Sequence, residues 1–154
     1  MRESERVATS PYYLFALAAG AMLPFQFGIN AVLARYVDGA ARAALVSFVV
    51  GSLALLVAVL LFCRGAPPVA KAGAAPWWVW VGGLLGAFYV LGSVVTAPQV
   101  GAATLVALIL AGQAAASLTV DHFGLVGFQE STVTPGRLVG IGLVALGVVL
   151  VRVL

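Results

Sequence analysis

The side chains best suited to hold a polar molecule in this chain are three carboxamides set in apolar sequence. Gln26 and Asn30 follow Pro24 and, at a spacing of four, share one face of a helix. Gln113 stands among glycine and alanine residues. A neutral amide at membrane depth either bonds another helix or lines a water-filled path. We therefore predict that the three amides face a common substrate cavity, and the alternative is that they join helices together.

Three hydroxyl side chains are weaker candidates for binding. Tyr89 and Ser93 are four residues apart, and Ser47 lies in another apolar run. A serine hydroxyl often donates to a carbonyl of its own helix, so each serine has a structural alternative to binding a substrate. The predicted substrate-binding set is therefore Gln26, Asn30, Gln113, Tyr89 and Ser93.

The sequence does not favour catalysis. One histidine, one cysteine and five acidic residues supply neither a nucleophile–base pair nor a cluster with metal-ligand spacing. Asp121 and His122 end an apolar run and are suited to a proton or gate site. We favour the alternative, that Asp121 caps loop backbone or pairs with Arg137. We expect no catalytic residue, no metal, no cofactor and no enzyme activity.

Five apolar segments must position these side chains. Hydrophobic residues make up 63% of the 154 residues and charged residues only 8%, whereas a soluble domain carries about 25% charge. The fold class predicted is an all-α integral membrane protein, a single domain over 1–154 with five transmembrane helices and short loops. Runs long enough to cross a bilayer place the helices at residues 12–34, 43–62, 77–97, 101–120 and 137–154.

Small residues and prolines predict how the helices pack. Pro24 has no amide hydrogen for the carbonyl of Gly20, so we expect a kink there. In the fourth helix an alanine recurs at every fourth position, and we expect this face to lie against another helix rather than lipid. The stripe consists of Ala103, Ala107, Ala111 and Ala115.

Basic residues are scattered, so the net charge of +3 indicates loops beside lipid headgroups and no nucleic-acid partner. With five spans, the N-terminal tail and the second and fourth loops share one side of the membrane. That side holds Arg2, Arg6, Arg64, Lys71 and Arg137, and the other holds Arg35, Arg42 and Arg152. Five against three places the N-terminus inside by a margin of two residues. This small margin permits insertion in both orientations.

Three stretches carry a resemblance to a known family: FQFGINAVLARYVDGAARAALVSFVVGSLALL, WWVWVGGLLGAFYVLGSVVTAPQVGAATLVALILAGQAAASLTVDHFGLVGF and GRLVGIGLVALGVVLV. Over about Tyr13–Val151 they resemble the five-helix YdcZ-like branch of the drug/metabolite transporter (DMT) superfamily. The last two helices are similar to the end of the ten-helix EamA-type transporters, whose penultimate helix ends in an acidic residue, the position of Asp121. The resemblance implies a multi-pass protein of the bacterial inner (plasma) membrane, half the size of an EamA-type chain, that exports or transports small molecules.

The resemblance also bears on the substrate. Small multidrug members of the superfamily use a carboxylate in the first helix for proton-coupled antiport. Here all five acidic residues fall in tails, loops or helix ends. We therefore expect a neutral or zwitterionic substrate in a polar central cavity; its identity, the transport direction and the coupling ion stay open. The alternative is a non-transporting membrane subunit, or an inactive half that assembles with a partner.

Five helices are few to enclose a pathway, so we expect a dimer in the lipid bilayer. Two antiparallel copies would create the pseudo-two-fold symmetry of inverted-repeat transporters, with the third and fourth helices near the interface. The rival is a heterodimer with a sibling chain of opposite charge bias.

Overall fold

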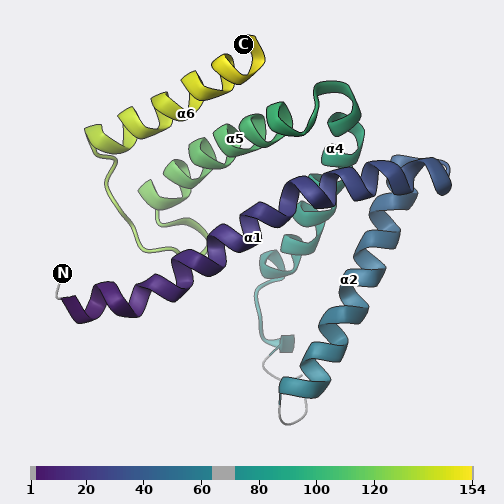
Figure 1. Cartoon of the computed structure of the whole chain (residues 1–154). Coiled ribbons are helices and arrows are strands. Elements are labelled where there is room, and N and C mark those ends of the chain that lie inside the picture. Colours follow the sequence, from purple (N-terminus) through teal and green to yellow (C-terminus); the bar gives the residue numbers. More distant parts are fainter. Residues whose placement is uncertain (1–2, 64–71, 154) are drawn as a thin grey trace. The chain divides into compact units, whose positions relative to one another are not determined.

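The computed structural model describes the backbone of residues 3–63 and 72–153 (Figure 1). Within these ranges the chain forms helices and no strand. Five of them are long: α1 (Glu3–Tyr36), α2 (Ala40–Phe62), α4 (Gly82–Val100), α5 (Ala102–His122) and α6 (Pro135–Val153). Two short 3₁₀ helices are η1 (Trp77–Val81) and η2 (Leu125–Gly127). Of the positions used in the predictions, Arg2, Arg64, Lys71 and Leu154 lie outside the described residues, as does the side chain of Arg6.

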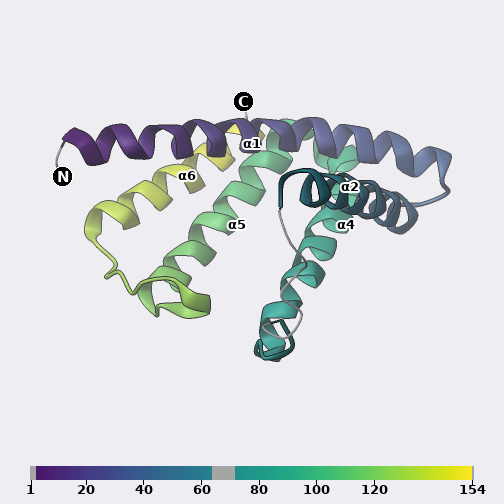
Figure 2. The same ribbon diagram turned by 90° about the horizontal axis from the view of Figure 1, so that it is seen from below.

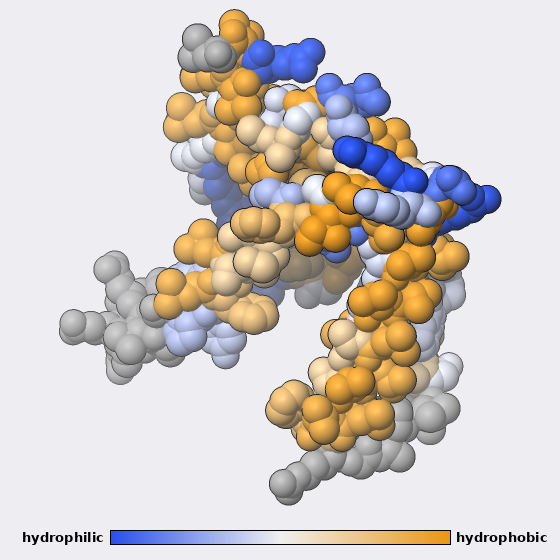
Figure 3. Space-filling model, turned by 45° about the vertical axis from the view of Figure 1, so that its right-hand side comes forward, coloured by the Kyte–Doolittle hydropathy of each residue, from blue (hydrophilic) through white to orange (hydrophobic). Residues whose placement is uncertain are grey.

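The helices confirm the predicted all-α membrane fold. Five spans are long and apolar enough to cross a bilayer: Pro11–Tyr36, Ala40–Phe62, Trp77–Val100, Ala102–His122 and Pro135–Val153. Hydrophobic side chains cover much of the surface visible in Figure 3. An apolar surface of this extent marks a membrane protein, because lipid and not water must cover it.

Several helix bounds differ from the sequence prediction: α2 begins at Ala40 rather than 43, and α4 continues through Pro98 to Val100 rather than ending near 97. The first and third spans differ at their starts. α1 begins at Glu3 rather than near residue 12, and it continues through both Pro11 and Pro24. Polar residues such as Glu and Arg have ordinary helix propensity in water, so a helix can extend beyond its apolar span. The third span opens with η1, where the Val79 amide donates to the Pro76 carbonyl at 3.2 Å, before α4 begins at Gly82. The kink at Pro24 stays a prediction.

The chain divides into two compact units, Met1–Pro24 with Val100–Leu154, and Phe25–Gln99. Each is described by itself below. The organisation as a single domain over 1–154 stays a prediction.

In the unit Phe25–Gln99, a tight turn joins the end of α1 to α2. Asp38 adopts the left-handed conformation (φ 53°), and the Gly39 amide donates to the Ala34 carbonyl at 2.9 Å, which closes the helix end. Gly39 itself has φ 139°, where a side chain would be strained. The exposed Arg42 guanidinium donates to the carbonyls of Val37 and Asp38, both at 3.3 Å.

The core of this unit lies where α1, α2 and α4 meet. Its buried residues are Ala43, Ala44, Val90 and Val94, and Leu33, Ala34, Val37, Ala40 and Tyr89 pack against them. Alanine at the start of α2 lets the neighbouring helices come close, because no longer side chain separates the backbones. This close packing fixes the positions of the polar side chains one or two turns away.

In the other unit, α5 and α6 run antiparallel and side by side (Figures 1 and 2). The alanine stripe is only partly covered: Ala107 and Ala111 are half-buried, whereas Ala103 and Ala115 are exposed. A four-residue spacing drifts by about 40° per step around a helix of 3.6 residues per turn. A strict four-residue stripe therefore cannot follow one neighbouring helix over its whole length.

Candidate functional site

One of the predicted amides is buried within an apolar span. Asn30 is 3% exposed, and its Oδ1 accepts a hydrogen bond from the Ser47 hydroxyl. The bond joins α1 to α2 within the unit Phe25–Gln99. The amide therefore does join two helices, yet neither N–H of its Nδ2 has a partner among the described residues.

A cavity of about 200 Å³ adjoins this hydrogen bond. Its polar wall comes from Gln26 on α1 and from Ser47 and Ser52 on α2. The apolar wall is formed by Phe48, Gly51, Leu55 and Val90. Ser47 belongs both to the cavity wall and to the hydrogen bond with Asn30, so the buried amide is one side chain removed from the cavity.

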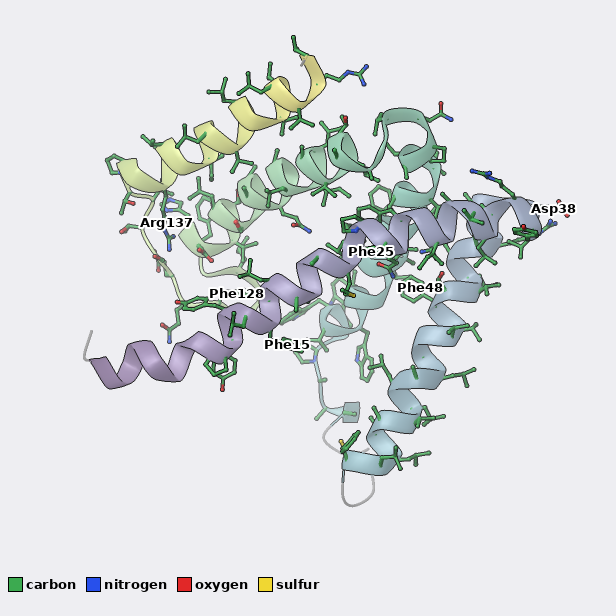
Figure 4. All side chains as sticks on the ribbon, viewed as in Figure 1. Phe15, Phe25, Asp38, Phe48, Phe128 and Arg137 are labelled. Atoms are coloured by element: carbon green, nitrogen blue, oxygen red, sulfur yellow. The ribbon has the colours of Figure 1, made fainter. Side chains whose placement is uncertain are left out.

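Phe48 sets one limit of this cavity. It projects from α2 on the side of α4 (Figure 4), and an ideal Cβ placed on Gly86 would lie 3.4 Å from its Cζ atom. The absence of a side chain at Gly86 thus lets the ring approach the α4 backbone.

The two hydroxyl candidates on α4 differ in their contacts. The Ser93 hydroxyl, 3% exposed, donates to the Val90 carbonyl of its own helix at 2.8 Å, which is the structural alternative. The ring of Tyr89 packs against Phe27 of α1, with centroids 6.1 Å apart and planes tilted by 59°. The Tyr89 hydroxyl is buried and has no partner within the described part of the chain.

Four of the five predicted site residues therefore belong to one unit, and Gln113 belongs to the other. Gln113 is exposed on α5, and its place in a common cavity with Gln26 and Asn30 stays a prediction. Sequence reasoning missed Ser52 and ranked Ser47 low. The available signal was the α2 pattern of Ser47, Gly51 and Leu55, whose spacing of four puts them on one face.

The acidic end of α5 carries an ion pair. Asp121 Oδ2 lies 3.3 Å from the Arg137 guanidinium at the start of α6, as the sequence analysis favoured (Figure 4). The Ser131 amide also donates to the Asp121 carbonyl at 2.7 Å. The ring of His122 instead contacts Phe123, with centroids 4.7 Å apart. These contacts tie the loop between α5 and α6 to both helix ends, which is a structural role.

A second cavity, of about 300 Å³, lies beside this ion pair between α5 and α6. Apart from the ion pair and Ser117, its lining is apolar: Ala114, Leu118, Gly140, Ile141 and Val144. The Ser117 hydroxyl donates to the Ala114 carbonyl at 3.0 Å, so its hydrogen is already used.

Comparison with known proteins agrees with this architecture. Residues 11–150 match the family described as "Putative inner membrane exporter, YdcZ". The chain is 33% identical over 113 residues to Inner membrane protein YdcZ of Escherichia coli (strain K12), an alignment that covers 71% of this chain and 73% of that protein. No solved structure matches the chain.

Proposed function

Because the chain belongs to the YdcZ family of inner membrane exporters, we propose that it carries a small neutral or zwitterionic molecule across the membrane through a polar cavity. Its family and its five spans make it a multi-pass inner membrane protein. The observation that supports the proposal is the part-buried Asn30–Ser47 hydrogen bond beside a cavity that Gln26 and Ser52 also line.

A buried polar pair with an unpartnered atom is costly inside a membrane, so its presence indicates a function. A polar group without a partner in the hydrocarbon region costs several kcal/mol. Within the part of the chain that the structure describes, the amide nitrogen of Asn30 nevertheless has no partner, although it lies in an apolar span. Polar residues inside a membrane commonly mark the path of a substrate.

The chemistry of the site suits reversible binding. Hydrogen bonds between membrane helices contribute about 0.6 kcal/mol on average. A ligand that satisfies both the Ser47 hydroxyl and Asn30 Oδ1 can therefore replace this bond at little cost. Neutral side chains replace the water shell of a polar molecule without holding it by charge, so the molecule can leave on the other side of the membrane.

Substitution of the three amides tests the proposal. In proteoliposomes, counterflow of a library of small polar metabolites should identify a transported compound. Gln26→Ala, Asn30→Ala and Gln113→Ala should each reduce its flux more than they reduce thermal stability. Gln99→Ala, an exposed amide at the end of α4, is the matched control. Unchanged flux in all three variants at equal protein content would remove the cavity from the mechanism, and no flux of any compound would favour the non-transporting subunit.

We further propose that the working unit is an antiparallel homodimer, with α4 and α5 near the interface. The support is the small number of spans and the weak charge bias between the two sides of the membrane. Ala74→Cys in a Cys63→Ser background places one exposed thiol before η1. An impermeant thiol reagent should label it from both sides of the inner membrane, in intact spheroplasts and in inverted vesicles. Labelling from one side only would exclude the dual-orientation homodimer and favour a sibling chain as partner.

A further inference from the structure

The cavity of about 300 Å³ between α5 and α6 is charged at one end and apolar along most of its remaining wall. Both helices belong to the same unit, and they run antiparallel (Figures 1 and 2). On each helix the four lining residues share one face, because the later three follow the first by three, four and seven positions. They are Ala114, Ser117, Leu118 and Asp121 on α5, and Arg137, Gly140, Ile141 and Val144 on α6. Seven residues of helix extend about 10 Å, so the cavity is a groove along the two helices.

The charged end of this groove lies at the level of the lipid headgroups. The span Ala102–His122 ends one residue after Asp121, and the span Pro135–Val153 begins two residues before Arg137. Charged side chains near the end of a span reach the membrane–water interface, whereas the following turns lie in hydrocarbon. The groove thus joins a polar entrance to an apolar interior, just as a phospholipid joins a headgroup to acyl chains.

The two charged side chains at the entrance are accessible and can form further hydrogen bonds. The side chain of Arg137 is 41% exposed and that of Asp121 35%, and the ion pair joins one guanidinium nitrogen to Oδ2 at 3.3 Å. A guanidinium has five N–H groups, and a carboxylate accepts at both of its oxygens. A phosphate can therefore bind the guanidinium while an ammonium donates to the carboxylate, both through charge-assisted hydrogen bonds.

Beyond this entrance the groove has room for a hydrocarbon chain. Apart from the adjoining α6 backbone, no described atom lies within 4 Å of a Cβ placed on Gly140. The Ser117 hydroxyl already donates to the Ala114 carbonyl of its own helix. An empty space in an apolar wall loses dispersion contacts, and an acyl chain restores them.

We propose that the groove binds one phospholipid whose headgroup carries a phosphate and a primary ammonium, namely phosphatidylethanolamine. Arg137 donates to the phosphate, Asp121 accepts from the ammonium, and an acyl chain lies along the groove past Gly140. A zwitterionic headgroup matches both members of the ion pair, whereas an anionic headgroup offers nothing cationic to the carboxylate. This inference goes beyond the proposed transport function and does not rest on it.

Three phospholipids with identical acyl chains test the headgroup selectivity. Phosphatidylcholine has a quaternary ammonium with no hydrogen to donate, and phosphatidylglycerol has a phosphate but no ammonium. Native mass spectrometry of the full chain, released from delipidated detergent micelles, measures the dissociation constant of each lipid. Phosphatidylethanolamine should bind about threefold to tenfold more tightly than either of the others, which corresponds to one hydrogen bond. Equal affinities for the three lipids would overturn the inference, and this comparison requires no variant.

Removal of the carboxylate tests whether the headgroup preference arises at this groove. Asp121→Asn should bring the affinities for phosphatidylethanolamine and phosphatidylcholine together. Asp38→Asn is the matched control, because Asp38 forms another exposed ion pair, with Arg42, at the turn between α1 and α2 (Figure 4). This control should keep the full preference of the parent. An undiminished preference in Asp121→Asn would place the headgroup elsewhere and overturn the assignment.

Filling the groove tests the position of the acyl chain. Gly140→Val places a branched side chain in the open space and should weaken binding of phosphatidylethanolamine by about fivefold or more, the effect of overpacking. Gly142→Val is the matched control, because it adds the same side chain to α6 at a residue that does not line the groove. Parental affinity in Gly140→Val, or an equal loss in both variants, would overturn the inference. If Asp121→Asn fails to fold, this pair and the lipid comparison in the parent still decide.

Discussion

The contact between Gly86 of α4 and Phe48 of α2 predicts that two substitutions at one position have opposite effects. A Cβ atom at Gly86 would lie 3.4 Å from Phe48 Cζ and 3.8 Å from Cε1, which is ordinary van der Waals contact. Gly86→Ala therefore fits, and it should raise the free energy of unfolding by about 0.5–1 kcal/mol, because glycine loses more backbone freedom than alanine in a helix. Gly86→Val adds two methyl groups beyond that contact and should lower the free energy of unfolding by about 1–3 kcal/mol through overpacking.

Reversible unfolding in mixed micelles measures both changes, and Gly92 provides the control on the same helix. No atom lies within 4 Å of a Cβ at Gly92, so Gly92→Ala should be stabilising and Gly92→Val should show no overpacking. Because Phe48 also lines the cavity, Gly86→Val should also reduce the flux of the transported compound. The reasoning would be refuted if Gly86→Val were as stable as Gly92→Val, since the close approach of Phe48 would then be absent.

Three further predictions concern other contacts of the two units. Arg137→Gln removes the ion pair with Asp121 and should lower the free energy of unfolding by less than about 1 kcal/mol, because both side chains are more than a third exposed and surface pairs contribute little. A double-mutant cycle with Asp121→Asn measures the coupling energy of the pair. A coupling energy that does not weaken in high salt would contradict a solvent-screened pair. Ala111→Leu should lower the free energy of unfolding by about 1–3 kcal/mol through overpacking, whereas Ala115→Leu should be neutral because Ala115 is exposed. Equal unfolding midpoints of these two variants would mean that Ala111 faces lipid. Ser93→Ala should change the free energy of unfolding by less than about 1 kcal/mol, since it removes a bond to the serine's own helix, and a larger loss in the same unfolding assay would point to a partner on another helix.

The number of helices could be predicted from the sequence, because an apolar run of bilayer length has few other stable structures. The start of α1 could not be, because the polar residues after Glu3 are compatible with helix or coil in water. The alanine spacing likewise identified a helix face but not its neighbour. Only the structure shows that Ala107 and Ala111 are half-buried and that Ala103 and Ala115 are exposed.

In the candidate site, too, residue types could be predicted from the sequence, whereas their hydrogen-bond partners could not. Asn30 was identified from its residue type, since an amide in an apolar span needs a partner. The identity of that partner, Ser47, depends on how α1 and α2 pack across the turn at Asp38, which sequence spacing does not determine. Ser52 was missed for the same reason. Ser93 is buried, but its hydrogen bond lies within α4, and its part in substrate binding stays a prediction.

The short turn between α1 and α2 bears on how the protein enters the membrane. The span Pro11–Tyr36 is the least hydrophobic of the five and Ala40–Phe62 the most. Only three residues separate the two helices, and the Asn30 amide of the first accepts a hydrogen bond from Ser47 of the second. If both helices leave the translocon together, the Asn30 amide enters lipid already bonded to Ser47. The more hydrophobic second helix then supplies the hydrophobic driving force for insertion that the first helix lacks. Insertion of the first span during synthesis should therefore depend on the second having emerged from the ribosome.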